Sequence, residues 1–354
     1  MREIRSLTGL RGYASLWVFF LHAMYGWPEG SFLVKIASLG GAGVIVFFVL
    51  SGYILSLTYA DRFRDESAGY RNFVIARLAR VYPLHLFTLF AFAFLVWLGY
   101  LEKMPTDNAY TFILNVLLIQ SWGFTDLVSW NQPSWSISTE FFAYLMFPLF
   151  IARLTKATFV FLAAVATALA CLIYFPIYDL SLKYAGITDG VRQFQFGSSL
   201  LSFFWVFAAG CTLYSFARRI RSNALISDLS TFAGLLFLVV SCLTTQSGLS
   251  LWQGTIASVL IIFGIRNDTG ISAMVFANPI IHFIGRVSFA LYLCASSVEW
   301  TARHYVNPLP LWANLALSLG VATALHYLVE VPARNAIRGA TVARKPQAPV
   351  IQSA

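Results

Sequence analysis

Charged residues are scarce in this chain of 354 residues. Asp, Glu, Lys and Arg make up 11% of the sequence, whereas they make up roughly 25% of ordinary soluble domains. Hydrophobic residues reach 58% and aromatic residues 16%. This balance excludes an ordinary soluble domain and indicates an integral membrane protein.

Cysteine is also rare, and its placement argues against two kinds of chemistry. The four cysteines, Cys171, Cys211, Cys242 and Cys294, lie singly in apolar segments. None of the spacings that bind zinc or carry out redox reactions is present. We therefore expect no bound metal and no tightly bound cofactor, and we interpret the cysteines as small packing residues.

The sequence has no long basic run, although its formal net charge is +9. The Lys and Arg residues lie between apolar runs instead of forming one patch. We therefore expect no nucleic-acid partner and interpret these residues as markers of membrane topology.

Eleven apolar runs are present, and their lengths suit helices that cross a bilayer of about 30 Å. They cover residues 11–28, 40–59, 81–101, 110–122, 137–152, 157–175, 198–217, 229–244, 249–265, 287–304 and 311–330. The run at 110–122 is short, contains Asn115 and Gln120, and leads into a polar segment with Pro133. We expect this run to be re-entrant or peripheral.

The positive-inside rule then favours ten crossings with both termini in the cytoplasm. This topology places on the cytoplasmic side all of the 24 Lys and Arg residues except Lys35, Lys103, Lys183, Arg192 and Arg303. The predicted fold is an all-α, polytopic membrane bundle of about ten helices. We expect one membrane domain over 1–338 and a flexible cytoplasmic tail over 339–354.

Two ionisable residues share one face of the first predicted span. Arg11 and His22 are eleven residues apart, so along a helix they are separated by about 16 Å and by three turns plus about 20°. Inserting an ionisable side chain at membrane depth costs a free energy of roughly 2.5–3.5 kcal/mol, so the presence of such a residue indicates a functional site. The alternative interpretation also stays open: Arg11 would be only a topology anchor, and His22 would be a core histidine paired with a neighbour.

Glu140 is the second ionisable group expected at membrane depth. In the ten-span topology it reaches a depth similar to that of His22, so the two side chains could meet. A carboxylate bonded to one imidazole nitrogen fixes the tautomer and leaves the other nitrogen free to accept a proton from a hydroxyl. The alternative is a carboxylate stabilised by the N-terminus of its own helix.

Five arginines gather in the connection at about 61–80, which we expect to be a loop that ends just before a span. They are Arg62, Arg64, Arg71, Arg77 and Arg80. Arg77 and Arg80 are three residues apart and would present two guanidinium groups side by side. Arginine suits phosphate binding, so a phosphate-bearing ligand is one interpretation and anionic lipid headgroups are the other.

Several of these segments together resemble the acyltransferase-3 family of bacterial integral membrane acyltransferases. The resemblance runs through Arg11 and His22 with ten residues between them, Phe47–Tyr53, Arg77–Arg80, Trp135–Glu140 and Glu330–Arg334. One feature departs from the pattern, because many relatives have a histidine where this chain has Ala295.

The resemblance implies a membrane-bound O-acyltransferase in the bacterial inner membrane. Its donor would be cytoplasmic acyl-CoA, most simply acetyl-CoA, used as a co-substrate, and its acceptor a hydroxyl of an envelope carbohydrate or glycolipid. His22 and Glu140 would be catalytic. Arg11, Arg77, Arg80 and Trp135 would bind the donor or substrate. The alternative is a proton-coupled transporter or exporter of an anionic or acylated substrate.

Overall fold

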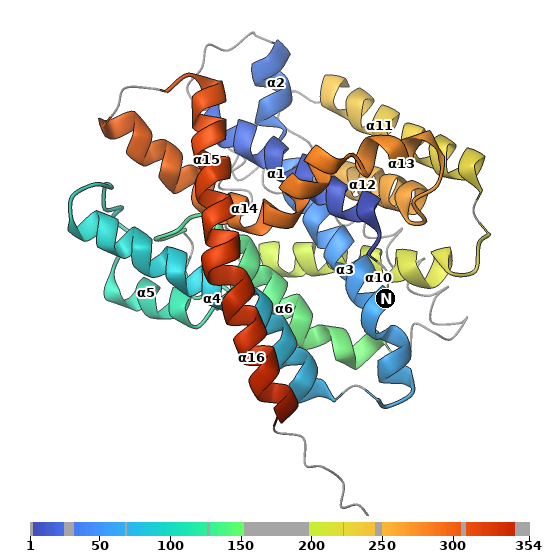
Figure 1. Cartoon of the computed structure of the whole chain (residues 1–354), viewed down its shortest axis with the longest axis horizontal. Coiled ribbons are helices and arrows are strands. Elements are labelled where there is room, and N and C mark those ends of the chain that lie inside the picture. The colour runs from blue at the N-terminus through green and yellow to red at the C-terminus, as the bar shows by residue number, and fades with distance from the viewer. Residues whose placement is uncertain are drawn as a thin grey trace, which may run out of the picture.

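The computed structural model describes residues 3–24, 32–67, 69–125, 128–151, 198–221, 223–244, 250–305 and 309–343. Within these ranges the chain forms α-helices and one π-helical turn, and no strand (Figure 1). The elements are α1 (Arg5–Ala23), α2 (Phe32–Ser38), α3 (Gly41–Arg64), α4 (Tyr70–Trp97), α5 (Ala109–Val116), α6 (Ser134–Ile151), α10 (Ser198–Ala217), α11 (Ala224–Thr244), α12 (Leu251–Ile265), α13 (Gly270–Phe276), α14 (Pro279–Tyr305), α15 (Leu311–Leu325), η3 (His326–Glu330) and α16 (Val331–Ala343). The predicted all-α class is confirmed.

Several of the helices are long and apolar enough to cross a membrane. Six described helical segments meet this condition, and the pair α12 and α13, bent by 105°, gives a seventh if it counts as one span. α11 exposes a row of large apolar side chains, including Leu229, Phe232 and Leu236. Such a surface is stable against lipid and costly in water. The protein is therefore a multi-pass membrane protein.

The predicted count of ten crossings stays a prediction. The run at 157–175 lies outside the described residues, and α1 and α6 are not among the six segments. The run at 110–122 forms α5, which has eight residues, and a turn that follows it. An eight-residue helix rises about 12 Å, which is too short to span. The expectation that 110–122 does not cross is therefore confirmed.

Hydrogen bonds explain why the chain folds back after α5. The Ser138 hydroxyl of α6 donates to the Leu118 carbonyl at 2.8 Å, and the Trp122 indole donates to the Ser138 carbonyl at 3.0 Å. These bonds hold the turn after α5 against the first half of α6. They fix the position of the helix that carries Glu140.

The connection at 61–80 differs from the prediction, because most of it is helical. Arg62 and Arg64 lie in the last turn of α3, and α4 begins at Tyr70, so it already contains Arg71, Arg77 and Arg80. The prediction began this span at residue 81, where the long apolar run 81–101 starts. Burial of Phe73, together with its ring contacts to Tyr59 and Phe147, extends the helix by more than two turns.

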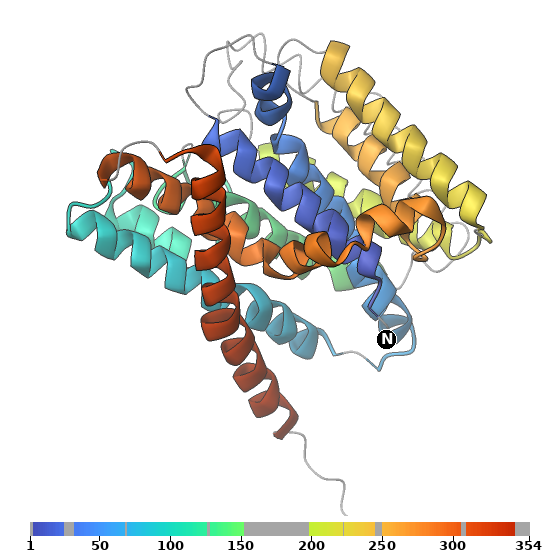
Figure 2. The ribbon, with the colours of Figure 1, turned by 45° about the horizontal axis from the view of Figure 1, so that its top comes forward.

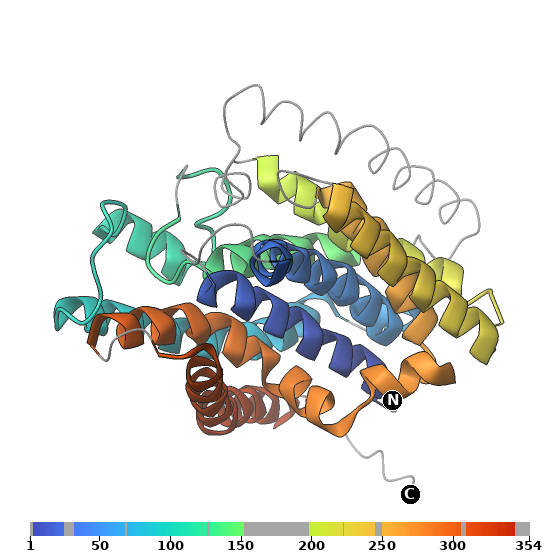
Figure 3. The same cartoon turned by 90° about the horizontal axis from the view of Figure 1, so that it is seen from above.

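Helix α1 lies between α14 and α3 (Figure 3). A Cβ atom at Gly12 would collide with the Ile281 carbonyl of α14, and one at Gly285 would collide with the Thr8 carbonyl of α1. Glycine at both positions allows the two backbones to approach closely, as small residues do in membrane helix pairs. The backbone N–H groups of Arg5 and Ser6 donate to Asp268, which caps α1 at its first turn.

The C-terminal helices form one long continuous element. α15 passes through the π-helical turn η3 into α16, which extends away from the other helices alongside α4 (Figure 2). The chain stays helical to Ala343, so residues 339–343 of the predicted flexible tail are helical. The remainder of that tail lies outside the described residues.

Candidate active site

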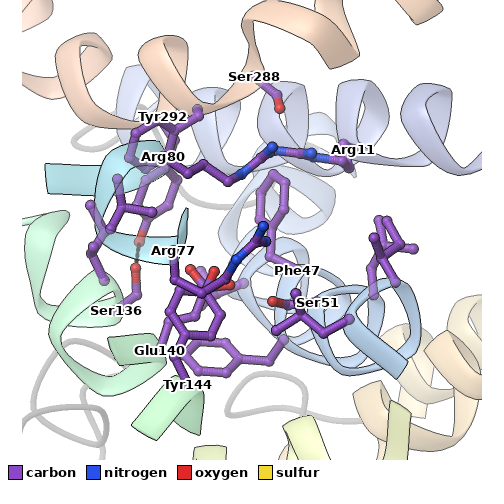
Figure 4. A pocket seen from close by; sticks show the side chains of 18 residues that line it. Arg11, Phe47, Ser51, Arg77, Arg80, Ser136, Glu140, Tyr144, Ser288 and Tyr292 are labelled. Atoms are coloured by element: carbon purple, nitrogen blue, oxygen red, sulfur yellow. Dashed lines mark hydrogen bonds between the residues drawn. The ribbon is translucent and has the colours of Figure 1, made fainter. Parts of the chain in front are cut away.

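A cavity of about 120 Å³ lies between α1, α3, α4, α6 and α14. Its lining includes every ionisable residue predicted for the site except His22, namely Arg11, Arg77, Arg80 and Glu140. In Figure 4 the side chains of Arg80 and Arg11 extend toward each other across the cavity, and Arg77 points into it from below. The fold thus brings these four residues, which span 129 positions from Arg11 to Glu140, to one cavity.

Arg77 is held by aromatic side chains. Its guanidinium carbon lies 5.3 Å from the centre of the Tyr59 ring and 5.9 Å from that of Phe73. Its Nη2 donates to the Tyr59 hydroxyl at 3.3 Å, while its buried Nε has no hydrogen-bond partner among the described residues. A buried N–H of a cation without a partner is costly, so Arg77 is oriented and ready to bind an anion.

Glu330 provides a counter-charge behind the other two arginines. It interacts electrostatically with both Arg80 and Arg11. The Glu330 side chain is 3% exposed, and its Oε2 lies 2.8 Å from His326 Nδ1, while its Oε1 lies 3.8 Å from Arg334 Nη1. These residues belong to η3 and α16, and π-helical turns occur frequently at functional sites.

Glu140 lines the cavity together with hydroxyl groups. Its carboxylate interacts with Tyr144, Tyr292 and Arg11. The hydroxyls of Tyr292 and Ser136 are 2.8 Å apart and share a hydrogen bond across the wall, which Figure 4 draws as a dashed line. One carboxylate therefore faces three guanidinium groups, and the cavity carries an excess of positive charge.

His22 lies in the last turn of α1, outside the lining of this cavity. Along α1 it is about 16 Å from Arg11. Glu140 lies with Arg11 at the cavity, and among the described residues the structure shows no contact between Glu140 and His22. The suggested pairing of these two residues and the catalytic role of His22 stay predictions.

Trp135 is also outside the cavity lining. It lies in α6, where its ring packs edge-on against Phe203 at 5.3 Å between centroids. Its neighbour Ser136 faces the cavity instead. A role for Trp135 in binding therefore stays a prediction, and its observed contact is with the helical core.

Sequence reasoning did not select five hydroxyl-bearing residues of the lining as site residues: Ser51, Ser136, Tyr144, Ser288 and Tyr292. Ser51 and Glu330 both lie in segments that carry the family resemblance, so those motifs held a usable signal. His326 gave a weaker one, four residues before Glu330 and so on the same side of a helix. Nothing local in the sequence marked Ser288 or Tyr144.

Within the described ranges, no group of three or more His, Cys, Asp or Glu side chains is placed to hold a metal ion. Cys211, Cys242 and Cys294 are free thiols, and Cys171 lies outside those ranges. The cavity lining itself, with guanidinium groups beside a carboxylate and several hydroxyls, suits recognition of an anion.

A family model described as an acyltransferase domain matches residues 4–331. The chain belongs to this acyltransferase family. The match extends from just before α1 to the first residue of α16, so all the cavity-lining residues of this acyltransferase-family member fall within it. The family resemblance predicted from the five motifs is confirmed.

Curated relatives carry names that agree with the family. Acyltransferase MdmB of Streptomyces mycarofaciens is 34% identical over 162 residues, which cover 44% of this chain and 41% of MdmB. "Putative O-acetyltransferase SACOL0978" of Staphylococcus aureus (strain COL) is 24% identical over 95% of this chain and 58% of its own length. "Putative peptidoglycan O-acetyltransferase YrhL" of Bacillus subtilis (strain 168) is 26% identical over 64% of this chain and 36% of its own length.

The chain spans less than two thirds of the length of each of these relatives, from 36% to 58% in the three. No solved structure matches it at a significant level.

Proposed function

We propose that this protein is an O-acyltransferase that moves an acyl group, most simply acetyl, from acyl-CoA to a hydroxyl of a carbohydrate or glycolipid of the bacterial envelope. It would act in the inner membrane, with its donor on the cytoplasmic side. The family supports acyl transfer, and the names of two relatives support acetyl transfer to oxygen. The peptidoglycan relative supports a carbohydrate acceptor.

The observation that carries the donor assignment is the convergence of Arg11, Arg77 and Arg80 on one cavity that Glu140 alone cannot neutralise. Guanidinium groups bind phosphate in bidentate geometry. A volume of about 120 Å³ takes a small group such as a phosphate, so most of a CoA molecule would lie outside the cavity. The arginines thus suit the phosphates of the donor better than its whole nucleotide.

In the proposed reaction, the acceptor hydroxyl attacks the carbonyl carbon of the thioester. His22 accepts the hydroxyl proton as the new C–O bond forms, and the C–S bond then breaks. The leaving sulfur takes up a proton, so the products are the ester and free CoA thiol. Since His22 is about 16 Å along α1 from Arg11, the long pantetheine arm would connect the phosphates to the reacting carbon. Glu140 supports the reaction from the cavity, where its carboxylate attracts the Arg11 guanidinium.

Purified protein in detergent, incubated with radiolabelled acetyl-CoA and candidate glycans, tests this proposal. Transfer of label to a glycan is expected, and it distinguishes an enzyme from a transporter, because detergent removes the sealed compartment that transport requires. The proposal would be contradicted by a preparation that labels no glycan in detergent and yet transports the acylated glycan after it is reconstituted in vesicles.

A further inference from the structure

A second cavity, of about 550 Å³, lies between α4, α14 and α15 and shares no lining residue with the arginine cavity. Side chains such as Phe87, Leu95, Leu293 and Val321 form its wall. All three helices belong to the segments that are apolar enough to cross a membrane. The cavity therefore lies among membrane-spanning helices, where a hydrocarbon group can be accommodated.

Both threonine hydroxyls of this wall are bonded to their own helices. The Thr88 hydroxyl donates to the His85 carbonyl at 3.0 Å, and that of Thr301 donates to the Ser297 carbonyl at 2.8 Å. Among the described residues that line the cavity, none is charged. The wall thus presents carbon atoms, and apolar surface gains most from an apolar occupant.

A small cavity of about 20 Å³, whose lining includes amide and hydroxyl groups, adjoins the apolar one, because Phe92 and Ser297 line both. Asn131 and Gln132 contribute amide groups to it, and Trp130 and Trp300 contribute indole rings. A volume of this size takes one hydroxyl-sized group. The two cavities together have the polarity of an amphiphile, with a long apolar part and one polar end.

Two buried polar atoms in the small cavity have no hydrogen-bond partner among the residues that the structure describes. Asn131 is 1% exposed, and its Nδ2 donates to the Leu293 carbonyl at 3.3 Å, while its Oδ1 accepts no hydrogen bond from that part of the chain. The Ser296 hydroxyl is also buried, and no described residue is bonded to it. Leaving such groups unsatisfied costs about 1–3 kcal/mol each, so they favour a ligand that can donate and accept hydrogen bonds.

The chemistry of the polar end follows from its surroundings. Among the described residues that line the small cavity, none is charged, so nothing there compensates a phosphate or a quaternary amine. An uncharged hydroxyl satisfies both Asn131 Oδ1 as a donor and Ser296 Oγ as an acceptor or donor. The indole of Trp300, 45% exposed, offers an apolar face beside this group.

The same turn of α14 borders both the arginine cavity and the apolar cavity. Tyr292 lines the arginine cavity, whereas the next two residues, Leu293 and Cys294, line the apolar one. The start of α6 divides in the same way, with Pro133, just before the helix, on the small cavity and Ser136, in its first turn, on the arginine cavity. The Ser136–Tyr292 and Asn131–Leu293 hydrogen bonds join these two segments into a shared wall.

We propose that the apolar cavity and the small cavity together bind an amphiphilic acceptor, with its apolar body between α4, α14 and α15 and an uncharged hydroxyl of its head group at Asn131 and Ser296. This proposal rests on the proposed function, because it gives the acceptor a site next to the donor. It narrows the acceptor to a hydroxyl-bearing compound with an apolar body, such as a glycolipid.

Equilibrium binding to the purified protein in an amine-oxide detergent tests the site without any acyl donor. The probes are radiolabelled dodecyl maltoside and dodecylphosphocholine, which share a chain and differ in their head groups, both below their micellar concentrations. We expect the maltoside to bind about tenfold more tightly. Ala91→Trp fills the apolar cavity from α4 and should weaken maltoside binding about tenfold or more, whereas Ala93→Trp, on the same helix but outside the lining, should change it by less than about twofold.

Ser296→Ala should weaken maltoside binding about fivefold and leave phosphocholine binding unchanged, because it removes one hydrogen bond to the head group. Val321→Trp fills the same cavity from α15 and replaces Ala91→Trp if that variant does not fold. Equal affinity for the two probes, or full maltoside affinity in the folded tryptophan variants, would overturn the site. Since no donor is present, these results do not depend on acyl transfer, and loss of transfer with intact maltoside binding would overturn only the proposed function.

Discussion

The hydroxyls of Ser136 and Tyr292 lie 2.8 Å apart and join α6 to α14 at the wall of the arginine cavity. α6 also carries Glu140, so this hydrogen bond fixes the distance between the only carboxylate of the described lining and the helix opposite. The bond thus connects a structural contact between two membrane helices with the geometry of the candidate site.

Tyr292→Phe tests this contact. The ring stays, and its edge-on packing against Phe47 at 6.1 Å is kept, while the hydrogen bond is lost. We expect acyl transfer to fall about fivefold to tenfold with a melting temperature close to that of the parent, because one neutral hydrogen bond contributes about 1 kcal/mol. Tyr70→Phe is the matched control, since it removes an exposed hydroxyl bonded to the Leu145 carbonyl, away from the cavity. Equal losses in both variants would argue against a specific role for the wall.

Replacing Arg77 and Arg80 together with alanine tests the donor site. We expect the KM for acetyl-CoA to rise about 10-fold to 100-fold, because two charge-assisted contacts to phosphate are lost. Arg71→Ala, in the exposed first turn of the same helix, should leave this KM unchanged. An unchanged KM in the double variant would remove the arginines from the donor site.

Glu330→Gln tests the counter-charge behind the arginines. The buried pair with His326 and the attraction to Arg80 and Arg11 would be lost, leaving cations without compensation. We expect a loss of about 3 kcal/mol in stability, measured by thermal unfolding in detergent, together with weaker donor binding. The control Glu102→Gln changes an exposed carboxylate and should do neither. A fully stable Glu330→Gln protein would show that the pair is dispensable.

The sequence predicted the positions of the helices along the chain better than it predicted how the helices pack against one another. Long apolar runs predicted α3, α10 and α12 closely, because a bilayer requires about 20 apolar residues per crossing. The same criterion put the start of α4 too late, since its first turns are held by aromatic contacts of Phe73 and not by lipid. The π-helical turn at His326–Glu330 has no local signature in the sequence.

The site shows a similar division. The three-residue spacing of Arg77 and Arg80 predicted a shared face, and both line the cavity. The partner of Glu140 could not be read from the sequence, because the packing of α1 against α14 and the fold-back after α5 decide which residue it meets. The apolar cavity was also invisible, since an apolar residue facing lipid and one facing a cavity look alike in a sequence.

The most direct test of the central claim is a measurement on His22→Ala, in which acetyl transfer to the acceptor and acetyl-CoA affinity are determined on the same preparation. We expect transfer to fall at least about 100-fold, because the base is lost, while acetyl-CoA affinity and thermal stability stay close to those of the parent. This outcome would assign the proton-transfer step to His22 and show that donor binding does not depend on it. Full transfer by His22→Ala would contradict the account.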